Sequence, residues 1–164
     1  MSPYLRIFGS VLIVLAATFV ARGYSRYCEA RLRTLEGFLS FLLHIKGEIK
    51  RTLTTPEGFV RDFKCEELSE CGFLSAVGSG EPLHGAYLSS LPKLKMGVNA
   101  RELLSEFFEG FGKDYAEGER IRTESYAQKL ERIAESERES LPKNVKLCRA
   151  LLLAGALGLI ILII

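Results

Sequence analysis

The chain has 164 residues, of which 48% are hydrophobic and 26% are charged. Its 22 basic and 20 acidic residues leave a net charge of only +2, which does not indicate a nucleic-acid partner. The length allows one modest helical domain, and the four cysteines require no oxidising compartment.

The first predicted element is an uncharged, apolar run from Ile7 to Ala21. A bilayer core of about 30 Å needs roughly 17–25 helical residues, so the run is slightly short unless Arg6 extends it by reaching the headgroups. A cleaved signal peptide fits less well, because Phe19 and Ala21 are not an Ala-x-Ala pair and arginines follow at once. We therefore expect a transmembrane helix over residues 1–23.

A leucine-striped helix is predicted next, from Tyr24 to Leu53, running straight out of the first segment. Apolar residues recur in it at three- and four-residue steps, as they do along one face of a helix. The stripe consists of Leu32, Leu35, Leu39, Leu42, Ile49 and Leu53, widened by Phe38 and Ile45.

Short helices separated by turns are expected between residues 55 and 98. Thr55 can cap a new helix that has Pro56 in its first turn. Glycines and prolines divide the rest into two further helices, Glu66–Val77 and Leu83–Leu91. Valine, isoleucine and threonine are too sparse there for a sheet, so no strand is expected.

A phenylalanine-rich helix is predicted after residue 98. Asn99 and Glu102 have the spacing of a capping box, in which the first side chain accepts from the first turn and the second reaches back. The apolar positions that follow are Leu103, Leu104, Phe107, Phe108 and Phe111. Gly110 and Gly112 interrupt this pattern, so the chain should turn there.

A long polar helix should follow, over Tyr115–Leu141, with Asp114 and Glu117 as its cap. Its apolar line is narrow and consists of Tyr115, Tyr126, Ala127, Leu130, Ile133, Ala134 and Leu141. Such a line favours antiparallel packing against the Tyr24–Leu53 helix. Pro142 is a point at which the helix can kink.

The run Ala150–Ile164 is apolar on every face, so we expect a second transmembrane helix over residues 149–164. Cations lie on the inner side of both runs, whereas the outer side offers only Arg6; they are Arg22, Arg26, Arg31, Arg33, Lys143, Lys146 and Arg149. Cytoplasmic flanks carry such an excess of cations, so residues 24–148 should face the cytoplasm. The predicted fold is all-α: a cytoplasmic antiparallel helical bundle anchored in membrane lipid by one transmembrane helix at each end of the chain.

Several features follow one another in an order that is typical of one known family. They are an N-terminal span, a leucine-striped helix closing with Glu48-Ile49 and Thr55-Pro56, the sequence FFEGFG over Phe107–Gly112, a charged helix, and residues 143–149 leading into the last apolar run. In this order they resemble the stage III sporulation protein AB family over essentially the whole chain. The family's Phe-Gly, Leu-Gly, Ser-Asp turn is kept only as Phe108, Gly110, Phe111, Gly112 and Asp114.

The resemblance implies a membrane protein of endospore formers, on the mother-cell side of the outer forespore membrane. It would be a structural component of the channel between mother cell and forespore, neither an enzyme nor a cofactor-binding protein. Its soluble domain would be similar to the cytoplasmic domains of type II secretion and type IV pilus platform proteins. Other stage III channel proteins would be its partners, with the cytoplasmic AA ATPase as a neighbour. Whether the chain also forms a homo-oligomer stays open.

Two groups of residues are candidates for contacts. The first group, Phe107, Phe108, Gly110, Phe111 and Gly112, forms either an exposed partner patch beside the glycine turn or, more simply, part of the core. The second group consists of small residues that allow close packing of the two spans with each other or with a partner's spans. Its members are Gly9, Ala16, Ala17, Ala154, Gly155, Ala156 and Gly158.

Two alternative functions stay open. One is a platform subunit of a type II secretion or type IV pilus system, which would keep the fold. The other is a membrane-bound metal or redox sensor that uses Cys65, Cys71 and His84, although their spacing matches no standard zinc template. No phosphate-binding glycine loop or catalytic pattern favours an enzyme.

Overall fold

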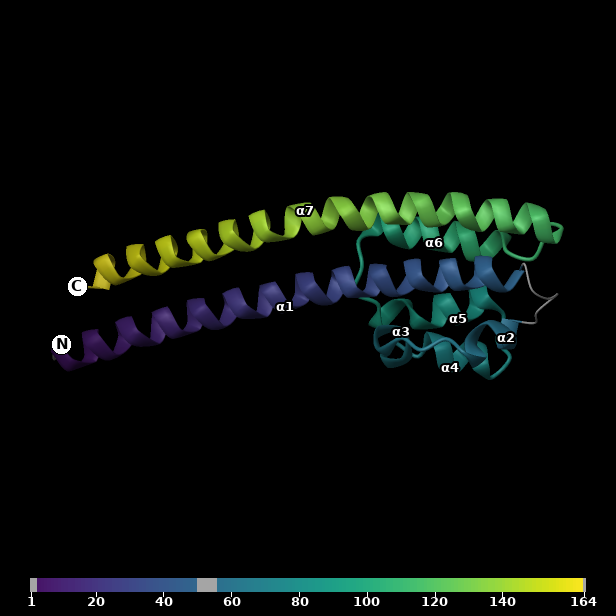
Figure 1. Cartoon of the computed structure of the whole chain (residues 1–164). Helices are drawn as coiled ribbons and strands as arrows, with labels where there is room; N and C mark the ends of the chain where they lie inside the picture. Colours follow the sequence, from purple (N-terminus) through teal and green to yellow (C-terminus); the bar gives the residue numbers. More distant parts are fainter. Residues whose placement is uncertain (1–2, 50–55, 164) are drawn as a thin grey trace. The chain divides into compact units, whose positions relative to one another are not determined.

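The computed structural model describes residues 3–49 and 56–163, and every regular element in these ranges is helical (Figure 1). The elements are α1 (Pro3–Ile49), α2 (Pro56–Arg61), α3 (Glu66–Glu70), α4 (Phe73–Gly78), α5 (Leu83–Ser90), the 3₁₀-helix η1 (Leu91–Lys93), α6 (Val98–Gly110) and α7 (Ala116–Ile163). The all-α prediction is confirmed. The predicted helix end at Leu53 and the cap at Thr55 lie outside the described residues.

The chain divides into two compact units. One combines Met1–Glu29 with Glu137–Ile164, and the other is Ala30–Ser136. Helices α1 and α7 each contribute one part to each unit. The domain limits 1–23, 24–148 and 149–164 stay a prediction.

The two long helices are continuous. Helix α1 runs from Pro3 to Ile49 without a break, as expected of a helix that emerges directly from the first apolar run. Helix α7 continues through Pro142, although proline has no N–H to donate to the carbonyl four residues earlier.

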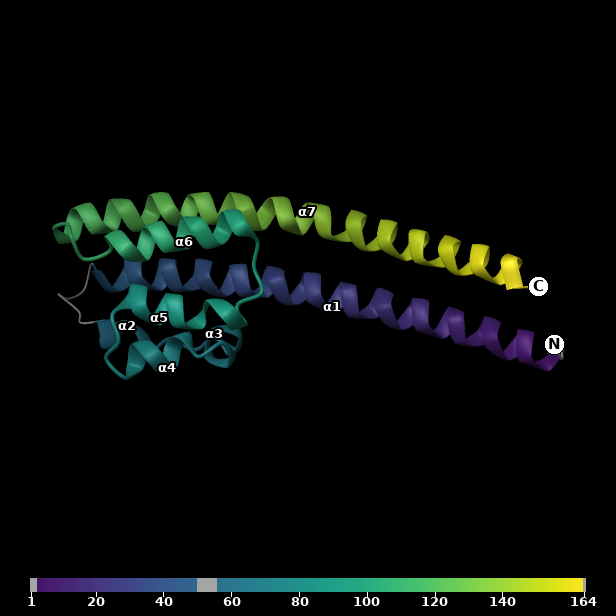
Figure 2. The same cartoon turned by 180° about the vertical axis from the view of Figure 1, so that it is seen from behind.

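The core of the Ala30–Ser136 unit is built around α1. Within this unit α6 and α7 lie on one side of α1 and α2 to α5 on the other, and α1 and α7 run antiparallel as predicted (Figures 1 and 2). Of the predicted stripe, Leu35, Phe38, Leu42 and Ile45 are fully buried, and so is Phe41, which the stripe did not include. Burial of each such side chain stabilises the fold by about 1.5–3 kcal/mol, so this face of α1 contributes substantially to stability.

The predicted helix over Glu66–Val77 is wrong in one respect, because the structure divides it into α3 and α4. Gly72 lies between them with φ +87°, a left-handed conformation that glycine adopts without strain. Helix α5 ends at Ser90, and the predicted last residue Leu91 belongs to the 3₁₀-helix that contains Pro92.

The predicted cap at Asn99 is also wrong. Helix α6 begins at Val98, and its cap position is Gly97, whose extended backbone makes no side-chain cap bond. The N–H of Arg101 already donates to the carbonyl of Gly97 at 3.1 Å. Asn99 is therefore a residue of the first turn of α6 rather than its cap, and its side chain is exposed, whereas the next residue, Ala100, is buried.

Candidate partner-contact site

The phenylalanines beside the glycine turn lie in the core. Phe107 and Phe108 are 0% and 2% exposed. The Phe108 ring lies 5.2–6.2 Å from the rings of Tyr87, Phe73 and Phe38. An exposed partner patch made of Phe107 and Phe108 is therefore wrong, and the core interpretation holds for both.

Phe111 is the half-buried member of the group. Its ring lies 5.9 Å from that of Phe59 in α2 and 5.5 Å from that of Phe107. It closes the edge of the core at the end of α6, so only part of its surface remains accessible.

A buried carboxylate shapes the turn between α6 and α7. Glu119 is 5% exposed, and its Oε1 accepts hydrogen bonds from the N–H groups of Gly112, at 3.0 Å, and Asp114, at 3.1 Å. Gly112 has φ +84°, which favours glycine. The predicted cap by Asp114 and Glu117 is wrong, because α7 begins at Ala116 and the turn is held by Glu119, another residue of its first turn.

Arg122 of α7 holds the end of α6. Its Nη1 donates to the carbonyl of Gly110 at 3.1 Å and its Nη2 to that of Glu106 at 3.0 Å. Gly110 is the last residue of α6, where a backbone carbonyl has no partner inside the helix, and Glu106 lies one turn earlier. A side chain at Gly110 would collide with this guanidinium, so glycine is needed there for a close approach.

An exposed aromatic residue lies at this turn. Tyr115 is 90% exposed and immediately precedes α7, and Ile121 on the second turn of α7 is 57% exposed. The prediction that Tyr115 belongs to the apolar line of the long helix is wrong. Tyr115 precedes α7, so the helical spacing of apolar residues does not apply to it. Tyr115 and Ile121 are therefore two exposed, largely apolar side chains at this end of α7.

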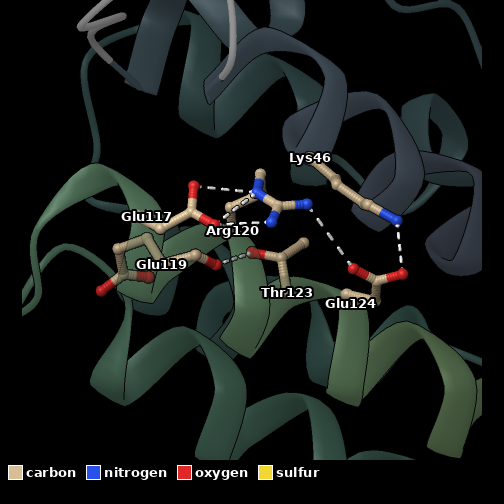
Figure 3. Close-up of polar contacts among 6 residues, drawn as sticks. All are labelled: Lys46, Glu117, Glu119, Arg120, Thr123 and Glu124. Carbon is tan, nitrogen blue, oxygen red and sulfur yellow. Dashed lines mark hydrogen bonds and ion pairs between the residues drawn. The ribbon is translucent and has the colours of Figure 1, made fainter.

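A charged network joins the start of α7 to α1 (Figure 3). The carboxylate of Glu117 accepts from Nε and Nη2 of Arg120 at 2.6–3.2 Å, which raises the pKa of that guanidinium. Arg120 also lies 3.8 Å from Glu124, whose other oxygen is 2.9 Å from Nζ of Lys46. Exposed ion pairs of this kind are screened by solvent, so this network adds little to the stability of the unit.

The sensor alternative finds no support in the described cysteines. Burial raises the pKa of the Cys65 and Cys71 thiols, and a protonated thiol is a poor nucleophile and metal ligand. The Cys65 thiol donates to Glu67 and the Cys71 thiol to the carbonyl of Leu68. Within residues 3–49 and 56–163, no three His, Cys, Asp or Glu side chains form a group that could hold a metal ion, His84 included.

Two helices are long and apolar enough to cross a membrane, judged by length and composition: Phe8–Ile49 and Ala116–Ile161. In their most apolar stretches only 6% and 11% of the residues are buried, unlike the core helix of a soluble protein. An added Cβ at Gly9, Gly155 or Gly158 would have no atom within 4 Å, and Ala16 and Ala154 are exposed. Contacts among the described residues therefore do not use these five, whereas Ala17 is half-buried and Ala156 is buried, and packing on a partner's span stays a prediction.

Comparison with known proteins identifies the family of this chain. The family model described as stage III sporulation protein AB matches residues 79–164, which contain α5, η1, α6 and α7 and are slightly more than half of the chain. No curated protein matches the chain, and no solved structure does. The expected similarity to secretion and pilus platform proteins stays a prediction.

Proposed function

We propose that this chain, which belongs to the stage III sporulation protein AB family and has a role in stage III of sporulation, is a structural component of the mother cell–forespore channel apparatus. The family match is the observation that carries this proposal. The two helices that are long and apolar enough to cross a membrane support an anchored component. The role is one of assembly and transmission rather than catalysis.

In this proposal the Ala30–Ser136 unit faces the cytoplasm of the mother cell. Its support is the distribution of charge around the apolar runs. Arg22 and Arg26 directly follow the first run, and Lys146 and Arg149 directly precede the second. Cations retained on the cytoplasmic side would orient both helices in this way.

The cytoplasmic ATPase would dock at the α6–α7 turn, through Tyr115 and Ile121. Tyrosine is enriched among the residues that dominate binding at interfaces, and Tyr115 is 90% exposed. The turn that carries it is held by Glu119 and Arg122, so little order would have to be created on binding.

Helix α7 would transmit the docking event. It is one helix from Ala116, beside the proposed contact, to Ile163 in the second apolar run. A displacement of its first turns by the ATPase would therefore be carried along a single element.

Disruption of the gene in the source organism tests the sporulation role. Cells induced to sporulate should complete engulfment and then stall, with forespores that shrink, when viewed by microscopy. Normal spores would refute the channel assignment and leave a platform subunit of another secretion or pilus system as the remaining interpretation.

Binding of the ATPase tests the docking surface separately. The full chain in mild detergent would be assayed against the purified ATPase. Tyr115→Ala should weaken binding by about 30-fold, because a hot-spot side chain contributes roughly 2 kcal/mol or more. Leu88→Ala on α5 is the matched control, since Leu88 is 46% exposed and lies on another helix. Equal effects of the two substitutions, or none from Tyr115→Ala, would contradict this surface.

A further inference from the structure

A cavity of about 340 Å³ lies within the unit formed by Met1–Glu29 and Glu137–Ile164. Both apolar runs contribute to it. Its lining residues are Ala17, Thr18, Ala21, Arg22, Arg149, Leu152 and Leu153. The cavity thus combines apolar and small side chains with two guanidinium groups.

Both arginines lie at the polar limit of their apolar run. Arg22 follows Ala21 directly, and Arg149 precedes Ala150 directly. Both side chains are exposed, and neither has a hydrogen bond or ion pair with another residue of the described ranges. The sequence has no acidic residue over 1–28 or 140–164, so the nearby charges do not neutralise the pair.

The donors of the cavity are suited to an anion. The hydroxyl of Thr18 donates to the carbonyl of Val14 at 2.8 Å, which leaves the two guanidinium groups as the side-chain donors of the lining. Arginine binds phosphate with paired, charge-assisted hydrogen bonds. Leu152 and Leu153 line the same cavity, and a small inorganic anion would leave their apolar surface uncovered, whereas the acyl chains of a lipid would cover it.

We propose that this cavity binds one anionic phospholipid. The phosphate contacts Arg22 and Arg149, and the acyl chains lie along Leu152 and Leu153. Basic pockets between membrane helices on the cytoplasmic side bind anionic headgroups by the same chemistry. The proposal rests on the membrane anchoring of the proposed function, and it adds a specific lipid site to it.

The experiment counts lipids on the full chain. The protein is placed in nanodiscs of phosphatidylcholine with a minor fraction of phosphatidylglycerol, and the retained lipids are identified by native mass spectrometry. We expect one retained phosphatidylglycerol on the wild type. Arg22→Gln with Arg149→Gln should lower its retention at least about tenfold, because the phosphate loses both of its charge-assisted hydrogen-bond donors.

A matched control removes the same charge outside the cavity. Arg26→Gln with Lys146→Gln leaves every lining residue in place, so the phosphatidylglycerol should be retained. Ala17→Leu fills part of the cavity without changing the charge, and it should lower retention as the arginine substitutions do. Circular dichroism of each variant shows whether its helices are intact.

Four results would overturn the proposal. The first is an equal loss of retained phosphatidylglycerol in both charge-removing pairs, which indicates a diffuse basic surface, and the second is a wild type that shows no preference for phosphatidylglycerol. The third is displacement of the lipid by millimolar inorganic phosphate, which indicates a simple anion site. The fourth is failure of the chain to enter the nanodisc. The lipid count uses purified protein, whereas the sporulation role fails only if gene disruption leaves normal spores. The two failures are therefore distinguishable.

Discussion

The contact between Gly110 and Arg122 can be tested by placing one methyl group on the glycine. A Cβ at Gly110 would collide with the Arg122 guanidinium. Because this group ends a flexible side chain, it can move aside. It then loses its hydrogen bonds to the carbonyls of Gly110 and Glu106, which are 3.1 and 3.0 Å long.

The magnitude of this loss follows from the two bonds. A hydrogen bond from a charged donor contributes about 1.5–3 kcal/mol, and partial exposure here reduces each to about 1 kcal/mol. Alanine is favoured over glycine by about 1 kcal/mol inside a helix and by less at its last residue, which Gly110 is. We therefore expect Gly110→Ala to lower the free energy of unfolding by about 1–2 kcal/mol. The melting temperature falls by about 4–8 °C per kcal/mol for domains of roughly this size.

The assay is thermal unfolding of the full chain in mild detergent, followed by circular dichroism. In an Arg122→Ala background, Gly110→Ala should be neutral or slightly stabilising, which gives a coupling energy of about 1–2 kcal/mol. Gly85→Ala in α5 is a matched control, because nothing lies within 4 Å of its added Cβ and it should not destabilise. An equal loss from Gly110→Ala with and without Arg122 would refute this explanation.

Three further predictions concern the Ala30–Ser136 unit. Phe38→Ala should lower the free energy of unfolding by about 3–5 kcal/mol in the same assay, because Phe38 is fully buried among aromatic rings; a loss below 1 kcal/mol would contradict the core. Burial raises the pKa of the Tyr87 hydroxyl well above its ordinary value. The contribution of the neutral Tyr87 side chain to the free energy of unfolding is therefore complete below about pH 10 and is lost as the pH rises further. Absorbance at alkaline pH should show that Tyr87 ionises late, together with unfolding, and ionisation of Tyr87 while the fold is intact would contradict this. A double-mutant cycle between Lys46 and Glu124 should give a coupling energy of about 0.2–1 kcal/mol that decreases as salt is added. A coupling energy that does not change with salt would show that the 2.9 Å ion pair between the two side chains is not its source.

The buried helix faces could be predicted from the sequence because they depend on periodicity alone. The α1 stripe repeats at the spacing of a helix, and its members Leu35, Phe38, Leu42 and Ile45 are fully buried in the structure. Long helices can be recognised in this way because many residues contribute to one pattern. The two apolar runs are recognised by their length and lack of charge.

The helix starts could not be predicted in the same way, because each depends on one or two hydrogen bonds. Asn99 has the right chemistry for a cap, yet α6 begins two residues earlier than a cap there would allow. Glu119 and Arg122 are three residues apart and suggest a surface ion pair. In the structure Glu119 instead binds the backbone of the turn, and Arg122 binds the end of α6. Contacts between a side chain and a distant backbone group leave no local signature in the sequence.

The candidate contact site shifts from phenylalanine to tyrosine for the same reason. An aromatic side chain can bury roughly 150–250 Å². The Phe108 ring already uses its surface on Phe38, Phe73 and Tyr87, so it has none left for a partner. Tyr115 is 90% exposed, on a turn whose N–H groups are bound by a buried carboxylate. A large side chain on a backbone that is already ordered loses little entropy on binding, and for this reason we propose this turn, rather than the phenylalanines, as the docking surface.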